Sequence, residues 1–453
     1  MTYRIGSAQG FYGDDVTKAL PMITGGHVDA VCFEALSELT LAILQKDRLA
    51  NPARGYTFDL NIIARQILPE AYKRKIPLIT NGGGLNPLAA AEMMRETAEK
   101  LGLYGIKIAA ITGDDVLAQL SELQAAGEPF TNLDTGEAIA KTLNQQFMAA
   151  NVYLGAAPIV QALHAGADIV ITGRVADPCL YLAPLIAHYD WEWDNWNMLA
   201  SGIVAGHLLE CTGQVVGGNS LAALRSLNPR DLPHLGYPIA EVEADGSFVI
   251  TKTPDTPGLV SVETVKEQLL YEVHDPANYL TPDVAADFTT LRLTQDGENR
   301  MRVSGIAGKP PPEKLKVNIA RLEGYMRELI FTIGYPEAWL KVEWLKAMIA
   351  ESWRDLPIGR ISYSNLGMNS LYGSLATLPD DPLEVIVRVM FTAQDQDTLK
   401  TATRRAMANG LSCPPGMSVS GSTIGGDPRA IVGLWPALIS RDKITPEIHF
   451  LEL

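Results

Sequence analysis

The sequence has little of what marks secreted, membrane-spanning or disulfide-stabilised proteins. Its four cysteines are far apart and form no CxxC pair, which is too few for a disulfide scaffold and fits a reducing compartment. No apolar run reaches the roughly 18 residues that a spanning helix needs. The first residues lack a basic segment followed by an apolar one. We therefore expect no signal peptide and a cytoplasmic protein.

Positive charge is also scarce. Lys and Arg total 37 against 52 Asp and Glu, which gives a net charge of −15. Such a balance argues against nucleic acid or an anionic membrane as a partner. Apolar residues make up 47% and charged residues 20% of the chain, which are values of a globular protein. At about 100–200 residues per domain, the length allows two to four domains.

Residues 1–213 alternate short apolar runs with amphipathic stretches. Each run is bounded by Gly, Asn or Asp, and continuous apolar runs of this length are typical of parallel strands buried on both faces. The predicted strands are residues 3–8, 29–35, 76–81, 106–112, 149–154 and 167–173.

Helical patterns lie between these runs. Residues 87–101 begin with a Pro suited to a first helical turn and end at Gly102, and residues 114–126 open with two acids and stop at Gly127. Alternating strands and helices predict βαβ units and one parallel sheet. Six strands favour an open, doubly wound sheet over a barrel, which needs eight.

Residues 214–307 have a different pattern. The stretches 241–251 and 289–305 each hold Asp-Gly between alternating runs, and Asp-Gly supplies the positive φ angles of tight hairpin turns. We expect a segment rich in β-hairpins here. Residues 308–314 (GKPPPEK) are Pro-rich and without periodicity, which predicts a linker.

Residues 308–453 predict a third domain. Its elements follow the order β-α-β-β-α-β, which is typical of a ferredoxin-like α+β domain. The predicted strands are 324–332, 358–363, 384–392 and 447–452, and the predicted helices are 336–353 and 397–409.

Polar residues directly follow the apolar runs of the N-terminal domain. The carboxyl ends of parallel strands lie at one edge of the sheet, where ligands bind, so we expect a shared site there. Gly, Asn and Asp also make ordinary turns, but six clusters in register favour a site. The polar residues at these positions are Ser7, Glu34, Glu38, Asn81, Asp114, Tyr153, Arg174 and Asp177.

Two of these clusters predict anion binding. In TNGGGLNP, Gly82, Gly83 and Gly84 precede a helix together with Asn86, so backbone N–H groups and the helix N-terminus could hold a carboxylate or phosphate. The alternative is an ordinary strand-to-helix turn. Arg174 could grip a carboxylate with Asp177 orienting it, or Asp177 could cap the next helix.

Known nucleotide signatures are missing. The chain has no GxxxxGK[ST], and its early glycines run G-x3-G-x2-G rather than G-x-G-x-x-G. Neither a P-loop nucleotide nor a nicotinamide cofactor is therefore expected, and the sequence names no other cofactor.

The segment AGHLLEC carries the most reactive side chains. In a helix, His207, Glu210 and Cys211 lie at i, i+3 and i+4 on one face. His207 could move a proton with Glu210 supporting it, and Cys211 could be a nucleophile if His207 lowered its pKa. Metal binding by the three, or plain core packing, are the alternatives.

Taken in order, several long segments resemble the acyclic terpene utilisation AtuA-like family. They include GSAQGFYGDD, FEALSELTLAIL, ITNGGGLNP, NVYLGAAPIV, ADIVITGRVADP and SGIVAGHLLECTGQVVGGN. The resemblance covers nearly all of residues 3–305 and returns near the end, while residues 306–410 match weakly. The matched positions considered as candidate site residues are Asn81, Asp114, Arg174, Asp177, His207, Glu210 and Cys211.

This resemblance implies a role in the catabolism of branched isoprenoid acids as coenzyme A thioesters. A lyase acting on a branched 3-hydroxyacyl thioester has been suggested for the family. Members often accompany a small ferredoxin-fold protein or carry it fused at the C-terminus. We expect no fused extension here, which leaves room for a separate small partner, and we expect a homo-oligomer.

Our first hypothesis is a lyase or hydro-lyase acting on a small branched acid or its thioester. Arg174 and the Asn81–Gly84 loop would hold the carboxylate, with Ser7 and Asn86 nearby. His207 and Glu210 would move a proton, and Asp114 would be a second acid or base. The alternatives are a non-catalytic ligand sensor or assembly protein, and a metal-dependent hydrolase.

Overall fold

The computed structural model describes residues 2–139, 147–419 and 426–453. The chain forms two compact units. Unit 1 comprises Met1–Ala320 and Leu434–Leu453, and unit 2 comprises Arg321–Gly433. The boundaries predicted from the sequence, 213/214 and 307/308, both fall inside unit 1.

A ten-stranded mixed sheet is the centre of unit 1. Its strand order is β11-β12-β8-β7-β1-β2-β3-β6-β4-β19. The five parallel strands are β1 (Tyr3–Ser7), β2 (Ala30–Phe33), β3 (Leu78–Thr80), β6 (Ile169–Thr172) and β4 (Lys107–Thr112). The antiparallel strands are β7 (Pro238–Val242), β8 (Phe248–Lys252), β12 (Met301–Ser304), β11 (Arg292–Gln295) and β19 (Glu447–Glu452).

The prediction of an α/β fold is confirmed, and five of the six early strands lie side by side as expected. The sixth, β5 (Phe147–Val152), is outside this sheet and pairs with β14. Its Ala150 and Val152 pack in a separate apolar cluster with Val317 and Trp435. The run is therefore buried, as predicted, but by residues distant in sequence.

The hairpin-rich segment extends the same sheet. β7 pairs with β8 across the turn that contains Asp245-Gly246, and β11 pairs with β12. β7 then lies antiparallel to β1. Both predicted hairpins are present, and they continue the N-terminal sheet.

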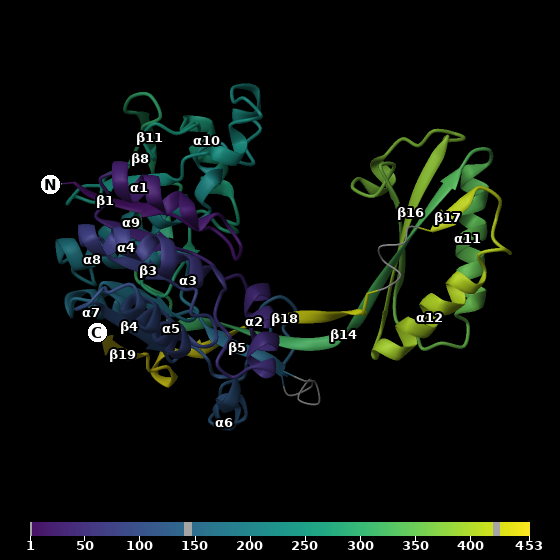
Figure 1. Cartoon of the computed structure of the whole chain (residues 1–453), viewed down its shortest axis with the longest axis horizontal. Coiled ribbons are helices and arrows are strands. Elements are labelled where there is room, and N and C mark those ends of the chain that lie inside the picture. Colours follow the sequence, from purple (N-terminus) through teal and green to yellow (C-terminus); the bar gives the residue numbers. More distant parts are fainter. Residues whose placement is uncertain (1, 140–146, 420–425) are drawn as a thin grey trace. The chain divides into compact units, whose positions relative to one another are not determined.

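Helices cover both faces of the parallel strands. In β2, Val31 and Phe33 belong to one apolar cluster, and Ala30 and Cys32 belong to the other. The first cluster includes α1 (Ala19–Gly25), α3 (Asp59–Ile62), α4 (Leu68–Arg74) and α5 (Pro87–Lys100), and the second includes α7 (Ala157–His164), α8 (Cys179–Tyr189) and α9 (Trp196–Glu210). In Figure 1, α1, α4 and α5 follow one another down the left part of the picture.

The connections place a topological switch point between β3 and β6. These strands are neighbours, yet β3 continues into α5 on one face and β6 continues into α8 on the other. In open α/β sheets, ligands bind outside the carboxyl ends of strands at such a switch point. The residues that follow β3 and β6 are therefore candidates for a site.

Smaller elements complete unit 1. β9 (Tyr279–Leu280), β10 (Ala285–Asp287) and β13 (Ala307–Lys309) form a three-stranded sheet in the order β13-β10-β9. The predicted linker at 308–314 is thus partly a strand. The remaining helices are α2 (Glu38–Ala50), α6 (Leu120–Ala125) and α10 (Val262–Leu270), and α6 is shorter than predicted.

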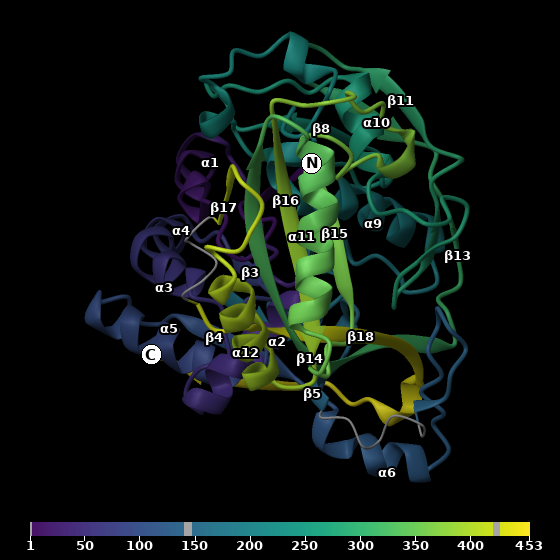
Figure 2. The same ribbon diagram turned by 90° about the vertical axis from the view of Figure 1, so that its right-hand side faces the viewer.

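Unit 2 is an antiparallel sheet with strand order β15-β16-β14-β17. Its elements are the part of β14 (Lys314–Gly334) from Arg321 onward, α11 (Ala338–Ser352), β15 (Ile361–Leu366), β16 (Glu384–Ala393), α12 (Gln396–Ala408) and β17 (Met417–Val419). β18 (Arg429–Ser440) also pairs with β14, and its residues from Leu434 onward belong to unit 1. Figures 1 and 2 show α11 and α12 on the same side of this sheet.

The predicted order β-α-β-β-α-β is present in unit 2, but its last strand was wrong. Residues 447–452 form β19, which pairs with β4 in unit 1, whereas β17 is the fourth strand of unit 2. β17 has three residues, too few for a recognisable periodicity. Among the described residues, no helix has the length and apolar character needed to cross a membrane.

Candidate acid–base site

A cavity of about 890 Å³ opens in unit 1 at the carboxyl ends of β2 and β6. Its charged lining residues are Glu34, Glu38, Arg174, Asp177, Glu210, Glu272, Glu313, Lys314 and Lys316. Its larger apolar and aromatic lining residues are Phe11, Tyr12, Leu36, Leu133, Tyr153, Tyr271, Tyr279, Leu280, Leu315 and Leu438. We call it the unit 1 cavity. Carboxyl groups outnumber cations in it, which shapes its chemistry.

Arg174 is the central cation. It lies just after β6, and its side chain is 3% exposed. Nη2 donates to Asp177 Oδ1 at 2.5 Å, Nη1 donates to the Leu36 carbonyl, and the guanidinium lies 4.3 Å from the centre of the Tyr153 ring. The buried Nε has no hydrogen-bond partner within the described ranges. Sequence reasoning was right to pair Arg174 with Asp177.

Glu34 is the first of the buried carboxyls, directly after β2. Its Oε1 accepts hydrogen bonds from the Leu36 N–H at 2.6 Å and from Asn81 Nδ2 at 2.9 Å. Asn81 in turn accepts from the Ala35 N–H at 2.7 Å. Burial raises the pKa of Glu34 well above its ordinary value, and the nearby Asp177 raises it further. Asn81 thus orients a carboxyl of the cavity and is not itself part of the cavity wall.

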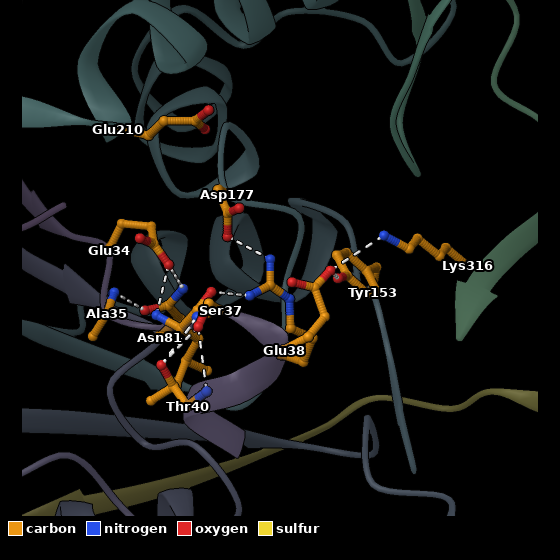
Figure 3. Close-up of polar contacts among 12 residues, drawn as sticks. Glu34, Ala35, Ser37, Glu38, Thr40, Asn81, Tyr153, Asp177, Glu210 and Lys316 are labelled. Carbon is orange, nitrogen blue, oxygen red and sulfur yellow. Dashed lines mark hydrogen bonds and ion pairs between the residues drawn. The ribbon is translucent and has the colours of Figure 1, made fainter. Parts of the chain in front are cut away.

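Glu38 behaves differently because it has partners of its own. Its carboxylate accepts a hydrogen bond from the Tyr153 hydroxyl and lies 3.3 Å from Lys316 Nζ. Burial alone would raise the pKa of Glu38, but Tyr153, Arg174 and Lys316 together lower it to about 2. Figure 3 shows this group and the Glu34–Asn81 pair on either side of Asp177.

Glu210 faces the cavity from the end of α9, with His207 behind it. Glu210 Oε1 lies 3.0 Å from His207 Nδ1, and His207 Nε2 lies 2.9 Å from the Gln268 carbonyl oxygen. Because Nε2 must donate to that carbonyl, Nδ1 of a neutral ring accepts, and the shared proton sits on Glu210. Glu210 Oε2 is buried without a partner among the described residues.

The pKa directions agree with a neutral pair. Burial lowers the pKa of His207 to about 4. Burial also raises the pKa of Glu210 well above its ordinary value, and the charge of Asp177 adds to that rise. Both shifts favour the neutral forms of the pair, and the carboxyl is the member that lines the cavity.

We predicted that His207 itself would contact the substrate, but the structure places His207 outside the cavity wall. The imidazole is 1% exposed, does not line the cavity and packs against Tyr279 and Phe288. Helix α9 is buried on nearly all sides, so its sequence pattern could not show which side chain reaches the cavity. Of the two, Glu210 lines the cavity and His207 lies behind it.

Asp114 is also placed away from the cavity. Its Oδ2 accepts hydrogen bonds from the Arg174 N–H at 2.7 Å and from Asn151 Nδ2 at 2.8 Å. Burial raises the pKa of Asp114 to about 6. It fixes the turn after β6, so a role as a second acid across the cleft is not supported by its position.

The triple-glycine loop serves close packing. A Cβ on Gly83 would lie 2.6 Å from the Thr172 carbonyl oxygen, and Gly84 has φ +55° and packs against Leu44. Asn86 caps α5 by accepting from the Ala89 N–H, so the first turn of α5 already has its side-chain acceptor. The cavity wall does not include Gly82, Gly83, Gly84 or Asn86. The structure therefore favours the alternative interpretation, an ordinary strand-to-helix turn.

The surroundings of Ser7 and Cys211 do not support the roles predicted for them. The Ser7 hydroxyl lies 2.7 Å from the Tyr181 hydroxyl and is fully buried, away from the cavity. Cys211 lines the cavity, but burial raises the pKa of its thiol, and Glu210 raises it further. A thiolate nucleophile is therefore not favoured at Cys211.

Metal ligation by the AGHLLEC residues is likewise not supported by their geometry. Within residues 2–139, 147–419 and 426–453, no group of three or more His, Cys, Asp or Glu is arranged to hold a metal ion. The sequence placed Glu34, Glu38 and Tyr153 at strand ends, but we did not select them as candidate site residues. Sequence reasoning missed Tyr279 and Lys316, which no local motif marks.

Comparisons with known proteins agree with the motif resemblance. The family model for the acyclic terpene utilisation family protein AtuA matches residues 3–450, including residues 306–410, where the motifs were weak. No curated protein matches the chain. An amidase of the hydantoinase/carbamoylase family from Burkholderia phymatum has 14% identity over 25% of this chain, with a TM-score of 0.17. The chain covers 30% of that structure, and we infer neither fold nor function from a similarity this low.

Proposed function

The chain belongs to the acyclic terpene utilisation AtuA family, and from this premise we propose that it is an enzyme of branched-chain or isoprenoid acid catabolism. We assign the reaction to the unit 1 cavity. The class we propose is a lyase or hydro-lyase acting on a branched 3-hydroxyacyl thioester or the corresponding acid. The chemistry is proton transfer next to a carbonyl, with cleavage of a C–O or C–C bond.

One observation carries this proposal: the carboxyl groups of Glu210 and Asp177 line the same cavity but have different partners. Glu210 contacts His207, and burial raises its pKa. Asp177 is ion-paired with Arg174, whose charge opposes the rise in the Asp177 pKa that burial causes. Pairs of titratable groups whose environments differ in this way are typical of general acid–base sites.

The imbalance of charge supports the same assignment. The charge of Asp177 raises the pKa of both Glu34 and Glu210, and the charge of Arg174 lowers the pKa of all three carboxyl groups. Three carboxylates around one guanidinium would repel one another, which favours protonation of at least one of them. A carboxyl that is protonated near neutral pH can donate a proton that an exposed Glu has already lost.

For C–O cleavage, Asp177 takes the C2 proton of the thioester, the C3–O bond breaks, and Glu210 protonates the departing hydroxyl. The products are water and a conjugated enoyl thioester, and the two carboxyl groups return to their starting states by proton exchange with solvent. For C–C cleavage, the Asp177 carboxylate takes the C3 hydroxyl proton, the C2–C3 bond breaks to give a carbonyl product and the thioester enolate, and the Glu210 carboxyl gives its proton to C2.

The test uses 3-hydroxy-3-methylbutanoyl coenzyme A as the probe. Elimination gives a conjugated thioester with new ultraviolet absorbance, and C–C cleavage gives acetone and acetyl coenzyme A, which mass spectrometry identifies. We expect turnover by the wild-type protein and a loss of about 10²–10⁴ in rate for Glu210→Gln, the usual size of a general acid–base contribution.

Glu122→Gln is the matched control, because Glu122 is an exposed carboxylate on α6, outside the cavity wall. It should retain the wild-type rate. Full turnover by Glu210→Gln would overturn the assignment of Glu210. Binding of the probe without conversion by the wild-type protein would instead support a ligand sensor and overturn the proposed enzyme.

A further inference from the structure

The hydroxyl of Tyr279 is a polar group at the unit 1 cavity that the protein leaves unused. Tyr279 lies on β9 and lines the cavity. No group in the described part of the chain makes a hydrogen bond to its phenol oxygen. Tyr279 is partly buried, and its oxygen is not one of the solvent-inaccessible polar atoms without a partner. A ligand that displaces solvent from the cavity can therefore take this hydroxyl as its hydrogen-bond partner.

The ring itself is firmly held. Its centroid lies 5.4 Å from that of His207 and 4.9 Å from that of Phe288. The backbone of Tyr279 pairs with Ala286 in the small sheet. These contacts fix where the hydroxyl lies before any ligand arrives, which is what a preorganised donor requires.

Three other tyrosine hydroxyls near the cavity are already engaged. The Tyr153 hydroxyl donates to Glu38, and the Tyr181 hydroxyl is bonded to Ser7. Tyr271 interacts with Glu272 and is 42% exposed. Tyr12 also lines the cavity, but Tyr279 has the ring that His207 and Phe288 hold in place.

The hydroxyl also stays protonated. Burial raises the pKa of Tyr279 well above its ordinary value, and the negative charges of Glu210 and Asp177 raise it further. It is therefore a neutral donor in a cavity lined mainly by carboxyl groups. Neutral donors can bind a carbonyl oxygen there without adding charge of their own.

We propose that the Tyr279 hydroxyl donates a hydrogen bond to the thioester carbonyl oxygen of the substrate and stabilises the negative charge that develops on it. This inference rests on the proposed function, because the charge develops when the C2 proton leaves. Arg174, Lys314 and Lys316 line the same cavity and are its cations. The substrate must accordingly present a carbonyl to this side of the cavity.

The experiment compares two ligands that differ only in that carbonyl. Calorimetry measures the binding of 3-methylbutanoyl coenzyme A and of its thioether, S-(3-methylbutyl) coenzyme A, to the full-length wild-type protein and to Tyr279→Phe. Phenylalanine keeps the ring that packs on His207 and Phe288. We expect the variant to bind the thioester about 2- to 10-fold more weakly, as for one lost neutral hydrogen bond, and the thioether equally well.

Turnover of 3-hydroxy-3-methylbutanoyl coenzyme A adds a second readout. Loss of one oxyanion donor should lower kcat by about 10²–10³ with a smaller change in KM. Tyr104→Phe, at an exposed tyrosine of unit 1, is the control and should match the wild-type protein in both assays. The thermal midpoint of Tyr279→Phe should also match.

Equal weakening for both ligands, or no change for either, would overturn the inference. The two proposals fail separately. If Glu210→Gln loses turnover but Tyr279→Phe keeps it and binds both ligands normally, the inference on Tyr279 falls alone. If the wild-type protein binds both ligands but does not convert 3-hydroxy-3-methylbutanoyl coenzyme A, the proposed function falls, and the thioester-to-thioether difference still decides whether Tyr279 contacts the carbonyl.

Discussion

Removal of the titrating imidazole of His207 should change how stability depends on pH. The ring is buried and neutral, with one nitrogen on Glu210 and the other on the Gln268 carbonyl. In the unfolded chain the same ring takes up a proton at its ordinary pKa. Protonation therefore favours unfolding, and stability must fall as the pH drops below that pKa.

The size of the effect follows from the two pKa values of His207, 6.5 in the unfolded chain and about 4 in the folded protein. The folded pKa is the lower one, so this contribution to stability is complete above about pH 6.5 and is lost as the pH falls toward about 4. Between about pH 7 and about pH 5, linkage gives a loss of about 2 kcal/mol in the free energy of unfolding.

The assay is urea unfolding, followed by tryptophan fluorescence, of wild-type protein and His207→Gln at both pH values. Other titrating groups are common to both proteins, so the difference between their pH dependences isolates His207. The wild-type protein should lose about 2 kcal/mol more than His207→Gln between the two pH values. His234→Gln, at an exposed histidine of unit 1, should follow the wild-type protein.

Parallel losses of stability in the wild-type protein and in His207→Gln would refute this reasoning. They would mean that the imidazole titrates with its ordinary pKa in the folded protein, whereas an imidazole already charged there would make the wild-type protein lose less stability than His207→Gln. In either case His207 could not hold Glu210 as a protonated carboxyl.

Two further predictions concern packing and capping. Gly83→Ala should lower the free energy of unfolding by about 1–3 kcal/mol, because its Cβ would lie 2.6 Å from the Thr172 carbonyl oxygen. The control is Gly25→Ala, whose Cβ would meet nothing within 4 Å and which should leave the free energy of unfolding nearly unchanged. The urea midpoints of the two variants are compared with that of the wild-type protein. Asp381→Ala should destabilise unit 2 by about 1 kcal/mol, since its carboxylate accepts from the Ala338 N–H at the start of α11. Hydrogen exchange should then rise in α11 with no change in unit 1, and unchanged exchange in α11 would contradict the capping role.

Local signals in the sequence predicted the parallel core well. The runs that became β1, β2, β3, β4 and β6 are apolar on both sides because helices cover both faces of these strands. The positions of β5 and β19 could not be predicted in this way. An apolar run shows that a strand is buried, but it does not identify the strand with which it pairs.

The candidate site was predicted in part for the same reason. Arg174 and Asp177 are three residues apart after a strand, so their pairing is local and was found. Glu210 and His207 are also local partners, but their helix is buried all round, and the side facing the cavity depends on distant chain. Tyr279 reaches the cavity through tertiary packing that leaves no mark in the neighbouring sequence.

The most direct test of the acid–base cavity is proton exchange at C2 of a substrate that cannot be cleaved. 3-Methylbutanoyl coenzyme A in D₂O, with the wild-type protein, should gain deuterium at C2, as mass spectrometry would show. Asp177→Asn should lose this exchange by about 10²–10⁴. Equal exchange by the variant, or none by a wild-type protein that binds the thioester, would contradict the account.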